Sequence, residues 1–102
     1  GYIITCIEGD AAHVISIATD PEHRRRGVGR LLLCTALELL VEGRVGEVFL
    51  EVRVSNEAAL RLYEAAGFEV VETLKNYYSD GEDGYMLSLR DRKKAREFCH
   101  SK

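Results

Sequence analysis

The segment from residue 13 to residue 33 constrains the fold of this chain more than any other. It reads H-V-I-S-I-A-T-D-P-E-H-R-R-R-G-V-G-R-L-L-L, so a strand pattern at His13–Ala18 leads through a Pro-containing turn into an apolar helix pattern. The first N–H groups of a helix lack intrahelical partners and carry partial positive charge, which attracts anions. Gly27 and Gly29 let a ligand approach the backbone closely, and the arginines beside them add charge. The segment therefore predicts a phosphate-binding turn.

The spacing within this turn excludes two common phosphate-binding loops. It is R-x-x-G-x-G, running from Arg24 through Gly27 to Gly29. No Gly-Lys-Ser/Thr follows, which excludes a P-loop, and Leu32 stands where a dinucleotide-binding loop has its third small residue. A charged turn that merely begins a helix is the alternative interpretation of this motif taken alone.

The composition limits the classes of protein and partner. The chain has 102 residues, enough for one small domain, and its 46% hydrophobic and 30% charged residues are typical of a globular protein. No apolar run reaches the roughly 20 residues of a membrane span, so no membrane partner is expected. The net charge of −3 argues against a nucleic-acid partner, because nucleic-acid-binding domains are usually basic.

The cysteines suggest a reducing environment. Cys6, Cys34 and Cys99 are widely separated, odd in number and form no C-x-x-C motif, so neither a metal site nor a disulfide framework is expected. Cys6 and Cys34 lie in apolar segments, which favours buried, hydrophobic side chains. This usage fits a cytoplasmic protein.

The order of the remaining patterns predicts a mixed sheet. The expected strands cover residues 1–8, 13–18, 46–54, 68–74 and 84–89, and the expected helices cover residues 27–42 and the segment from Ser55 or Asn56 to about Ala66. Strands without a helix between them pair antiparallel, whereas strand–helix–strand units give right-handed crossovers between parallel strands. We therefore expect an α/β (α+β) domain over residues 1–90, with a mostly antiparallel sheet, a central parallel strand pair and flanking helices. Residues 91–102 are expected as a polar tail, helical at most.

Two residues are candidates for acid–base chemistry. Glu51 lies in the middle of an otherwise apolar strand pattern, where a carboxylate shielded from water can act as a general base. Tyr63 lies on the helix that follows, and its phenol could protonate a leaving thiolate. The alternatives are an exposed glutamate on a strand face and a core tyrosine whose hydroxyl reaches water.

Three further residues are candidates for contacting a substrate. Tyr77 and Tyr78 precede the acidic run S-D-G-E-D, and such a pair is either exposed on a hairpin turn or able to clasp a peptide terminus. His13 begins a strand, a position where a histidine is more often structural than catalytic. Nucleophilic catalysis is not expected, because the sequence has no G-x-S-x-G motif and no cysteine with an evident activating partner.

Longer motifs resemble one enzyme family. The R-x-x-G-x-G turn resembles the acyl-CoA pyrophosphate loop of the GNAT superfamily of N-acyltransferases. The run L-E-V-R-V-S-N-E-A-A-L-R-L-Y-E-A-A-G-F resembles the strand–helix signature of RimI-type protein N-terminal acetyltransferases. The run L-K-N-Y-Y-S-D-G-E-D-G-Y-M-L is similar to archaeal RimI-like enzymes and to catalytic subunits of the NatA kind. The resemblance covers almost all of residues 13–90.

The resemblance implies a function and a role for each candidate residue. It implies direct transfer of an acetyl group from acetyl-CoA to a protein N-terminus, without an acyl-enzyme and without a metal. Glu51 would match the general base and Tyr63 the general acid, while Tyr77, Tyr78 and His13 would lie on the substrate side. The implied cofactor-binding residues are Ile17, Ala18, Thr19, Arg25, Arg26, Gly27, Val28, Gly29, Arg30 and Asn56.

By this resemblance, we expect the chain to lack an N-terminal part that the family normally has, and alternative functions remain open. The family has a strand, two helices and another strand before the point where this chain starts, so we expect an N-terminally truncated form with part of the specificity pocket. The expected partner is a protein N-terminal peptide, with a ribosomal protein as one candidate, and an auxiliary subunit is compatible with the family. The alternatives are a GNAT enzyme for a small amine or a lysine, and a truncated module that binds CoA or a partner without catalysis.

Overall fold

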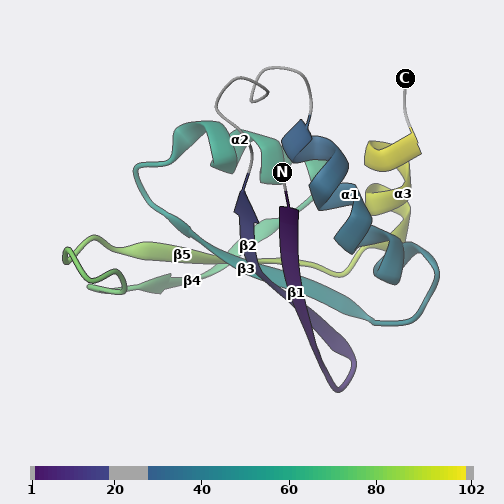
Figure 1. Cartoon of the computed structure of the whole chain (residues 1–102), viewed down its shortest axis with the longest axis horizontal. Coiled ribbons are helices and arrows are strands. Elements are labelled where there is room, and N and C mark those ends of the chain that lie inside the picture. The colour runs from purple at the N-terminus through teal and green to yellow at the C-terminus, as the bar shows by residue number, and fades with distance from the viewer. Residues whose placement is uncertain (1, 19–27, 101–102) are drawn as a thin grey trace.

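The computed structural model describes residues 2–18 and 28–100, which form one mixed sheet with helices packed on it (Figure 1). The sheet has five strands in the order β1-β2-β3-β5-β4. The elements in chain order are β1 (Tyr2–Glu8), β2 (Ala11–Ala18), α1 (Val28–Val41), β3 (Glu47–Arg53), α2 (Glu57–Ala66), β4 (Glu69–Leu74), β5 (Gly84–Leu89) and α3 (Arg92–His100).

The pairing confirms the mixed sheet expected from the sequence. β1 and β2 form an antiparallel hairpin, β2 pairs parallel with β3, and β5 pairs antiparallel with both β3 and β4. The central parallel pair arises because α1 carries the chain from the end of β2 back to the start of β3, so both strands run in the same direction.

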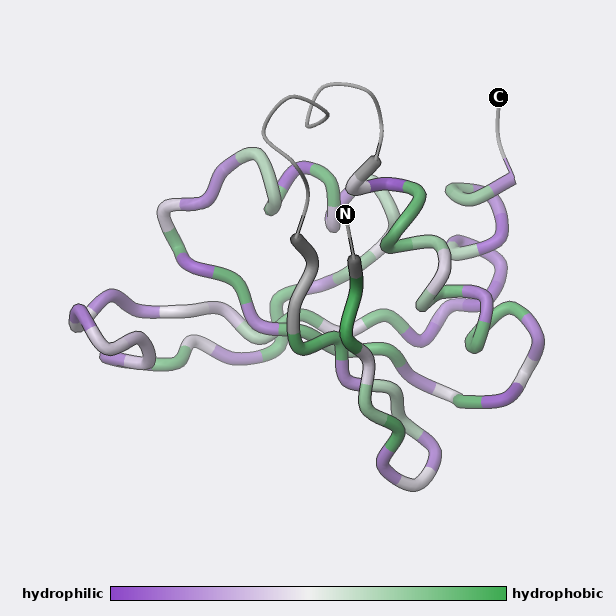
Figure 2. The backbone as a smooth tube through the Cα atoms, in the orientation of Figure 1, coloured by the Kyte–Doolittle hydropathy of each residue, from purple (hydrophilic) through white to green (hydrophobic). Residues whose placement is uncertain are grey.

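The core lies between the sheet and α1. Leu33, Leu37 and Leu40 recur at helical spacing and are almost completely buried. Val48 and Leu50 meet them from β3, where buried residues alternate with partly exposed ones. Figure 2 shows the apolar residues gathered on α1 and on the strands beneath it. The residues of β3 that alternate with this core side therefore face the opposite side of the sheet.

The ends of α2 follow the expected capping pattern. The Asn56 side chain accepts a hydrogen bond of 3.2 Å from the N–H of Ala59, which caps the start of the helix. Gly67 ends it in the left-handed conformation, with φ of 107°. The choice that the sequence left open between Ser55 and Asn56 is thus resolved in favour of Asn56.

Gly67→Ala tests this helix end. An added Cβ would lie only 3.0 Å from the Lys94 side chain. The left-handed backbone conformation of residue 67 also costs a non-glycine residue about 1–2 kcal/mol. We expect the free energy of unfolding, measured by urea titration, to fall by about that amount. Gly29→Ala is the control, because Gly29 lies within α1 and the added Cβ would meet only Leu62 at 3.9 Å. An equal loss of unfolding free energy in the two variants would contradict the left-handed end of α2 at Gly67.

The C-terminal segment, expected from the sequence as a polar tail, forms α3 and packs beside α1 (Figure 1). Ala95 is fully buried, and Arg92 Nε donates a 2.9 Å hydrogen bond to the carbonyl of Leu40. α1 is therefore covered on two sides, by the sheet and by α3. None of the helices in residues 2–18 and 28–100 has the length and apolar character that a membrane crossing requires.

The expectation for the cysteines was wrong. Cys34 in α1 forms a disulfide with Cys99 in α3, and Cys6 is an exposed free cysteine rather than a buried one. The two bonded cysteines are 65 residues apart in sequence, and only the packing of α3 on α1 brings them together. Cys6 lies on β1 at the edge of the sheet, where little covers its side chain.

Candidate active site

The candidate site lies on the sheet face opposite α1, where β2 and β3 separate. Their parallel ladder joins Ala11–Val14 to Glu47–Leu50, and both strands continue beyond it. The strands therefore part just before Glu51. A strand edge that leaves its ladder presents backbone N–H and C=O groups that a ligand with amide groups can pair with.

Glu51 and His13 form a hydrogen-bonded pair at this point. His13 Nε2 lies 2.7 Å from Glu51 Oε1, and the two side chains are 23% and 12% exposed. The imidazole ring also stacks on Phe49, with ring centroids 4.4 Å apart and planes 11° apart. Stacking and hydrogen bonding together fix the orientation of the imidazole, so the pair presents a carboxylate in a shielded, defined position.

Tyr63 lies on α2 and is largely buried. Its ring packs edge-on against Phe68, with centroids 5.7 Å apart. Burial raises the pKa of the Tyr63 phenol above its ordinary value, and the nearby Tyr78 adds to the rise. Tyr78 also interacts electrostatically with Glu51, so the three side chains belong to one neighbourhood. A raised pKa keeps the phenol protonated, which a general acid requires.

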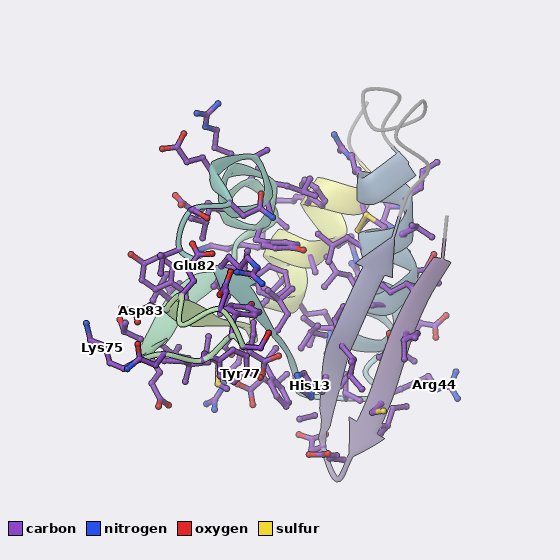
Figure 3. The ribbon with its side chains drawn as sticks, turned by 60° about the vertical axis from the view of Figure 1, so that its left-hand side comes forward. His13, Arg44, Lys75, Tyr77, Glu82 and Asp83 are labelled. Carbon is purple, nitrogen blue, oxygen red and sulfur yellow. A yellow bond between two sulfur atoms is a disulfide. The ribbon has the colours of Figure 1, made fainter. Side chains whose placement is uncertain are left out.

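Tyr77 and Tyr78 lie in the loop between β4 and β5. Their rings meet edge to face, with centroids 5.1 Å apart, and Tyr77 is 50% exposed. Both rings cover Gly84, where an added Cβ would lie 3.1 Å from Tyr78 and 3.4 Å from Tyr77. Figure 3 shows Tyr77 gathered with Glu82, Asp83 and Lys75 in this loop.

Arg53 anchors this loop to the end of β3. Its Nη1 group lies 2.8 Å from Asp80 Oδ2 and 2.8 Å from Glu82 Oε1, and its guanidinium lies 4.2 Å from the centroid of the Tyr78 ring. Glu82 Oε2 also accepts a 3.1 Å hydrogen bond from the N–H of Ser55. Arg53 and Glu51 alternate on the same face of β3, so the anchor fixes the tyrosines relative to the carboxylate.

Acid should break this anchor. The pKa of Asp80 is lowered from its ordinary 3.8, mainly by the Glu82 N–H and then by Arg53. The pKa of Glu82 is lowered from 4.5, mainly by hydrogen bonds from Ser55 and then by Arg53. Because both pKa values are lower in the folded protein, the ion pairs are intact above the ordinary values and are lost as the pH falls through the lowered ones.

Amide hydrogen exchange of residues 75–83 measures this effect. We expect exchange, corrected for its intrinsic pH dependence, to accelerate in that acidic range. Arg53→Gln is the matched variant, because it removes the guanidinium charge and should make the loop exchange fast at neutral pH already. A loop that stays equally protected in the variant and in acid would contradict the anchor.

The residues expected to bind the cofactor are only partly described. Ile17 and Ala18 lie on β2, where they pair with Ile3 and Tyr2 of β1. Asn56 is exposed and caps α2, just beyond the end of β3. The proposed contacts of Ile17, Ala18 and Asn56 with a pantetheine arm remain predictions. Thr19, Arg25, Arg26 and Gly27 lie outside the described residues.

The first turn of α1 carries the remaining cofactor candidates. Val28 begins the helix, and a Cβ added at Gly29 would make only an ordinary contact with Leu62 at 3.9 Å, so the backbone is not crowded there and a ligand could approach it. The guanidinium of Arg30 lies 4.5 Å from the centroid of the Phe98 ring, and Arg30 also donates to the Phe98 carbonyl oxygen. Arg30 is thus turned toward α3, a contact that the sequence did not predict.

The sequence singled out neither Phe49 nor Arg53. Their alternation with Glu51 along β3 was the available signal, because it puts all three side chains on one face. No group of His, Cys, Asp or Glu side chains within residues 2–18 and 28–100 is arranged to hold a metal ion.

Comparison with known proteins decides the family. Residues 1–68 match the profile of the acetyltransferase (GNAT) family. The chain belongs to this family. This GNAT chain is 46% identical over 77 residues to an N-alpha-acetyltransferase of Sulfurisphaera tokodaii, an alignment that covers 74% of the chain and 46% of the relative.

Solved GNAT structures share the fold of this chain. The ribosomal-protein-S18-alanine N-acetyltransferase from Escherichia coli matches with a TM-score of 0.78 and 41% identity, over 85% of this chain and 58% of that one. Naa50 of Arabidopsis thaliana, in complex with the bisubstrate analogue CoA-Ac-MVNAL, matches with a TM-score of 0.79 and 26% identity, over 85% and 62%. The chain thus spans about half the length of the curated archaeal relative and somewhat more of these solved chains.

Proposed function

We propose that this protein transfers the acetyl group of acetyl-CoA to the α-amino group of protein N-termini. The observation that carries the proposal is the shielded Glu51 carboxylate, held by His13 at 2.7 Å at the place where β2 and β3 part. The similarity to N-alpha-acetyltransferases and to a structure that holds a CoA–peptide bisubstrate analogue supports the same activity.

Two described features fit acetyl-CoA. The edge of β2 beyond Val14 leaves the parallel ladder, so the N–H and C=O groups of Ile17 and Ala18 are suited to pair with the amides of a pantetheine arm. The same role for Thr19 rests on the family resemblance alone. The first turn of α1, where Gly29 has no side chain, is suited to a pyrophosphate, which Arg25–Arg30 would surround. Asn56 would contact the cofactor between the separated strands. Acetyl-CoA supplies the activated acetyl group as a thioester.

The proposed mechanism is direct transfer with acid–base catalysis. A peptide α-amine has a pKa of about 8, so most of it is protonated at neutral pH. Glu51, oriented by His13 and acting through water, accepts the proton that the amine must lose. The neutral amine then attacks the thioester carbonyl, and a backbone N–H at Ile17–Thr19 stabilises the negative charge that develops on the carbonyl oxygen. Tyr63, kept protonated by its raised pKa, gives a proton to the leaving thiolate.

The loop between β4 and β5 supports a peptide terminus as the substrate. Tyr77 and Tyr78 would hold the first residues of the peptide, and Arg53 keeps both rings on the side of the sheet where Glu51 lies. The acidic residues of the loop favour the approach of a positively charged amine. The Escherichia coli structure is named for a ribosomal protein as substrate, so a ribosomal protein N-terminus in the cytoplasm is the first candidate here.

Competition between two peptides tests the function. One carries a free N-terminal alanine and no lysine, and the other has a blocked N-terminus and one internal lysine. After incubation with acetyl-CoA, mass spectrometry should find the acetyl group only on the free α-amine. Acetylation of the lysine peptide at a similar rate would favour the small-amine or lysine enzyme. Binding of acetyl-CoA without any acetylated peptide would favour a non-catalytic module.

A further inference from the structure

A covalent bond ties α3 to the helix that begins at the proposed cofactor site. The disulfide joins Cys34 to Cys99, whose Cα atoms are 5.6 Å apart. Phe98, the residue before Cys99, contacts Arg30 in the first turn of α1 through both its ring and its carbonyl oxygen. The bond therefore holds in place the part of α3 that engages Arg30.

The two ends of α3 are attached to α1 in different ways. Near its start, Arg92 donates to the Leu40 carbonyl and Ala95 is fully buried. At its end, the attachments include the disulfide, the Arg30–Phe98 contact and a 3.3 Å ion pair of His100 with Glu38, and Phe98 and Cys99 pack partly buried against the hydrophobic core. Exposed ion pairs contribute little to stability. Phe98 and Cys99 are only partly buried, whereas Ala95 is fully buried, so we expect loss of the covalent link at Cys99 to loosen the last turn of α3 more than its first part.

We propose that the Cys34–Cys99 disulfide is a redox switch for acetyl-CoA binding, acting through Arg30. In the oxidised chain, Phe98 holds the Arg30 guanidinium toward α3. In the reduced chain, the last turn of α3 moves away, and the guanidinium can turn to the cofactor pyrophosphate at the start of α1. The proposal rests on the proposed function, because it needs acetyl-CoA at that turn.

The redox step balances as thiol–disulfide exchange. When the disulfide forms, the thiols of Cys34 and Cys99 lose two protons and two electrons to a small-molecule disulfide, which becomes two thiols. A dithiol reductant reverses the reaction and is itself oxidised. Cytoplasmic disulfides are typically transient, catalytic or redox-sensing rather than permanent. Cys34 and Cys99 are both partly exposed in the oxidised chain, so such reagents have access to the disulfide before α3 moves.

Linkage gives the switch a second, reciprocal signature. A ligand that binds the reduced chain more tightly than the oxidised one must favour reduction by the same factor. Couplings between two sites in one protein are typically about 5- to 150-fold. We therefore expect a CoA ligand to shift the thiol–disulfide equilibrium of the chain toward the dithiol by the same ratio as the two affinities.

The experiment compares the oxidised chain with the phosphine-reduced chain. The probe is desulfo-coenzyme A, which has no thiol and cannot exchange with the disulfide, and its affinity is measured by calorimetry. We expect the reduced chain to bind it about fivefold or more tightly. Without ligand, amide exchange of residues 96–100 should accelerate on reduction while that of residues 92–95 changes little.

Variants separate the switch from a simple structural crosslink. The double substitution Cys34→Ser with Cys99→Ser should bind like the reduced chain under all conditions, whereas Cys6→Ser should keep the redox response. Arg30→Gln should bind weakly in both states, and Arg61→Gln, an equal loss of charge on α2, should keep the response. A crosslink alone predicts a lower melting temperature on reduction and an unchanged affinity.

The outcomes distinguish failure of the switch from failure of the cofactor site. Equal affinities of the oxidised and reduced chains would overturn the switch and leave the cofactor site standing. No binding of desulfo-coenzyme A in either state would refute the cofactor site, and the switch with it. Unchanged exchange at residues 96–100 on reduction would refute the release of α3, whatever the ligand does.

Discussion

Glu51→Gln is expected to lower kcat by about 10²–10⁴-fold, the usual contribution of a general base. Glutamine keeps the shape of the side chain and can still hydrogen-bond to His13, but it cannot accept the amine proton. The affinity for acetyl-CoA should stay nearly unchanged, because the proposed cofactor contacts lie on β2, α1 and Asn56. Initial rates of peptide acetylation and calorimetry of cofactor binding measure the two quantities separately.

Glu47→Gln is the matched control for this substitution. Glu47 lies on the same face of the same strand, four residues away, where its carboxylate accepts a 2.5 Å hydrogen bond from Ser88. We expect its kcat to match that of the unsubstituted chain. A stably folded Glu51→Gln variant with normal kcat would remove Glu51 from the mechanism and leave substrate positioning as the main source of rate.

Tyr63→Phe is expected to lower kcat and to change the shape of the pH–rate profile. The phenol must be protonated to act as an acid, so activity that depends on it is present at low pH and is lost as the pH rises through its pKa. Burial raises that pKa above 10.0, so the loss belongs to the far alkaline limb of the profile. Phenylalanine keeps the packing against Phe68 and has no proton to give, so that limb should move or vanish.

Tyr85→Phe controls for loss of a tyrosine hydroxyl. Tyr85 lies on β5, where it pairs with Val52 of β3 and packs against the core, so its substitution should leave kcat and the pH profile unchanged. If Tyr63 only packs, its variant should lose thermal stability and activity together, with no change in the shape of the profile. Combining Glu51→Gln with Tyr63→Phe should cost less than the product of the single effects if both act on one transition state.

The sequence was sufficient to predict the elements around the site. Alternation along β3 separated Val48 and Leu50, which are buried, from Glu51, which is not part of that core face. Asn56 and Gly67 marked the ends of α2, because capping and the left-handed conformation depend on local chemistry. These predictions succeeded because each rests on neighbours within a few residues.

Contacts between distant segments could not be predicted from the sequence. The His13–Glu51 hydrogen bond depends on the register that pairs His13 with Phe49 across a parallel ladder, and no local pattern specifies that register. The Arg53 anchor depends on how the β4–β5 hairpin folds back over the end of β3. The Cys34–Cys99 bond likewise depends on α3 packing along α1.

The measurement that tests direct acetyl transfer most directly is a matrix of initial rates in acetyl-CoA and an N-terminal peptide. A second sample of the protein is incubated with acetyl-CoA alone, and its intact mass is measured by mass spectrometry. Direct transfer predicts reciprocal plots that intersect, a peptide acetylated on its α-amine, and a protein whose mass is unchanged. Parallel plots together with an acetylated protein that passes its acetyl group to the peptide, or no acetylated peptide at any concentration, would contradict it.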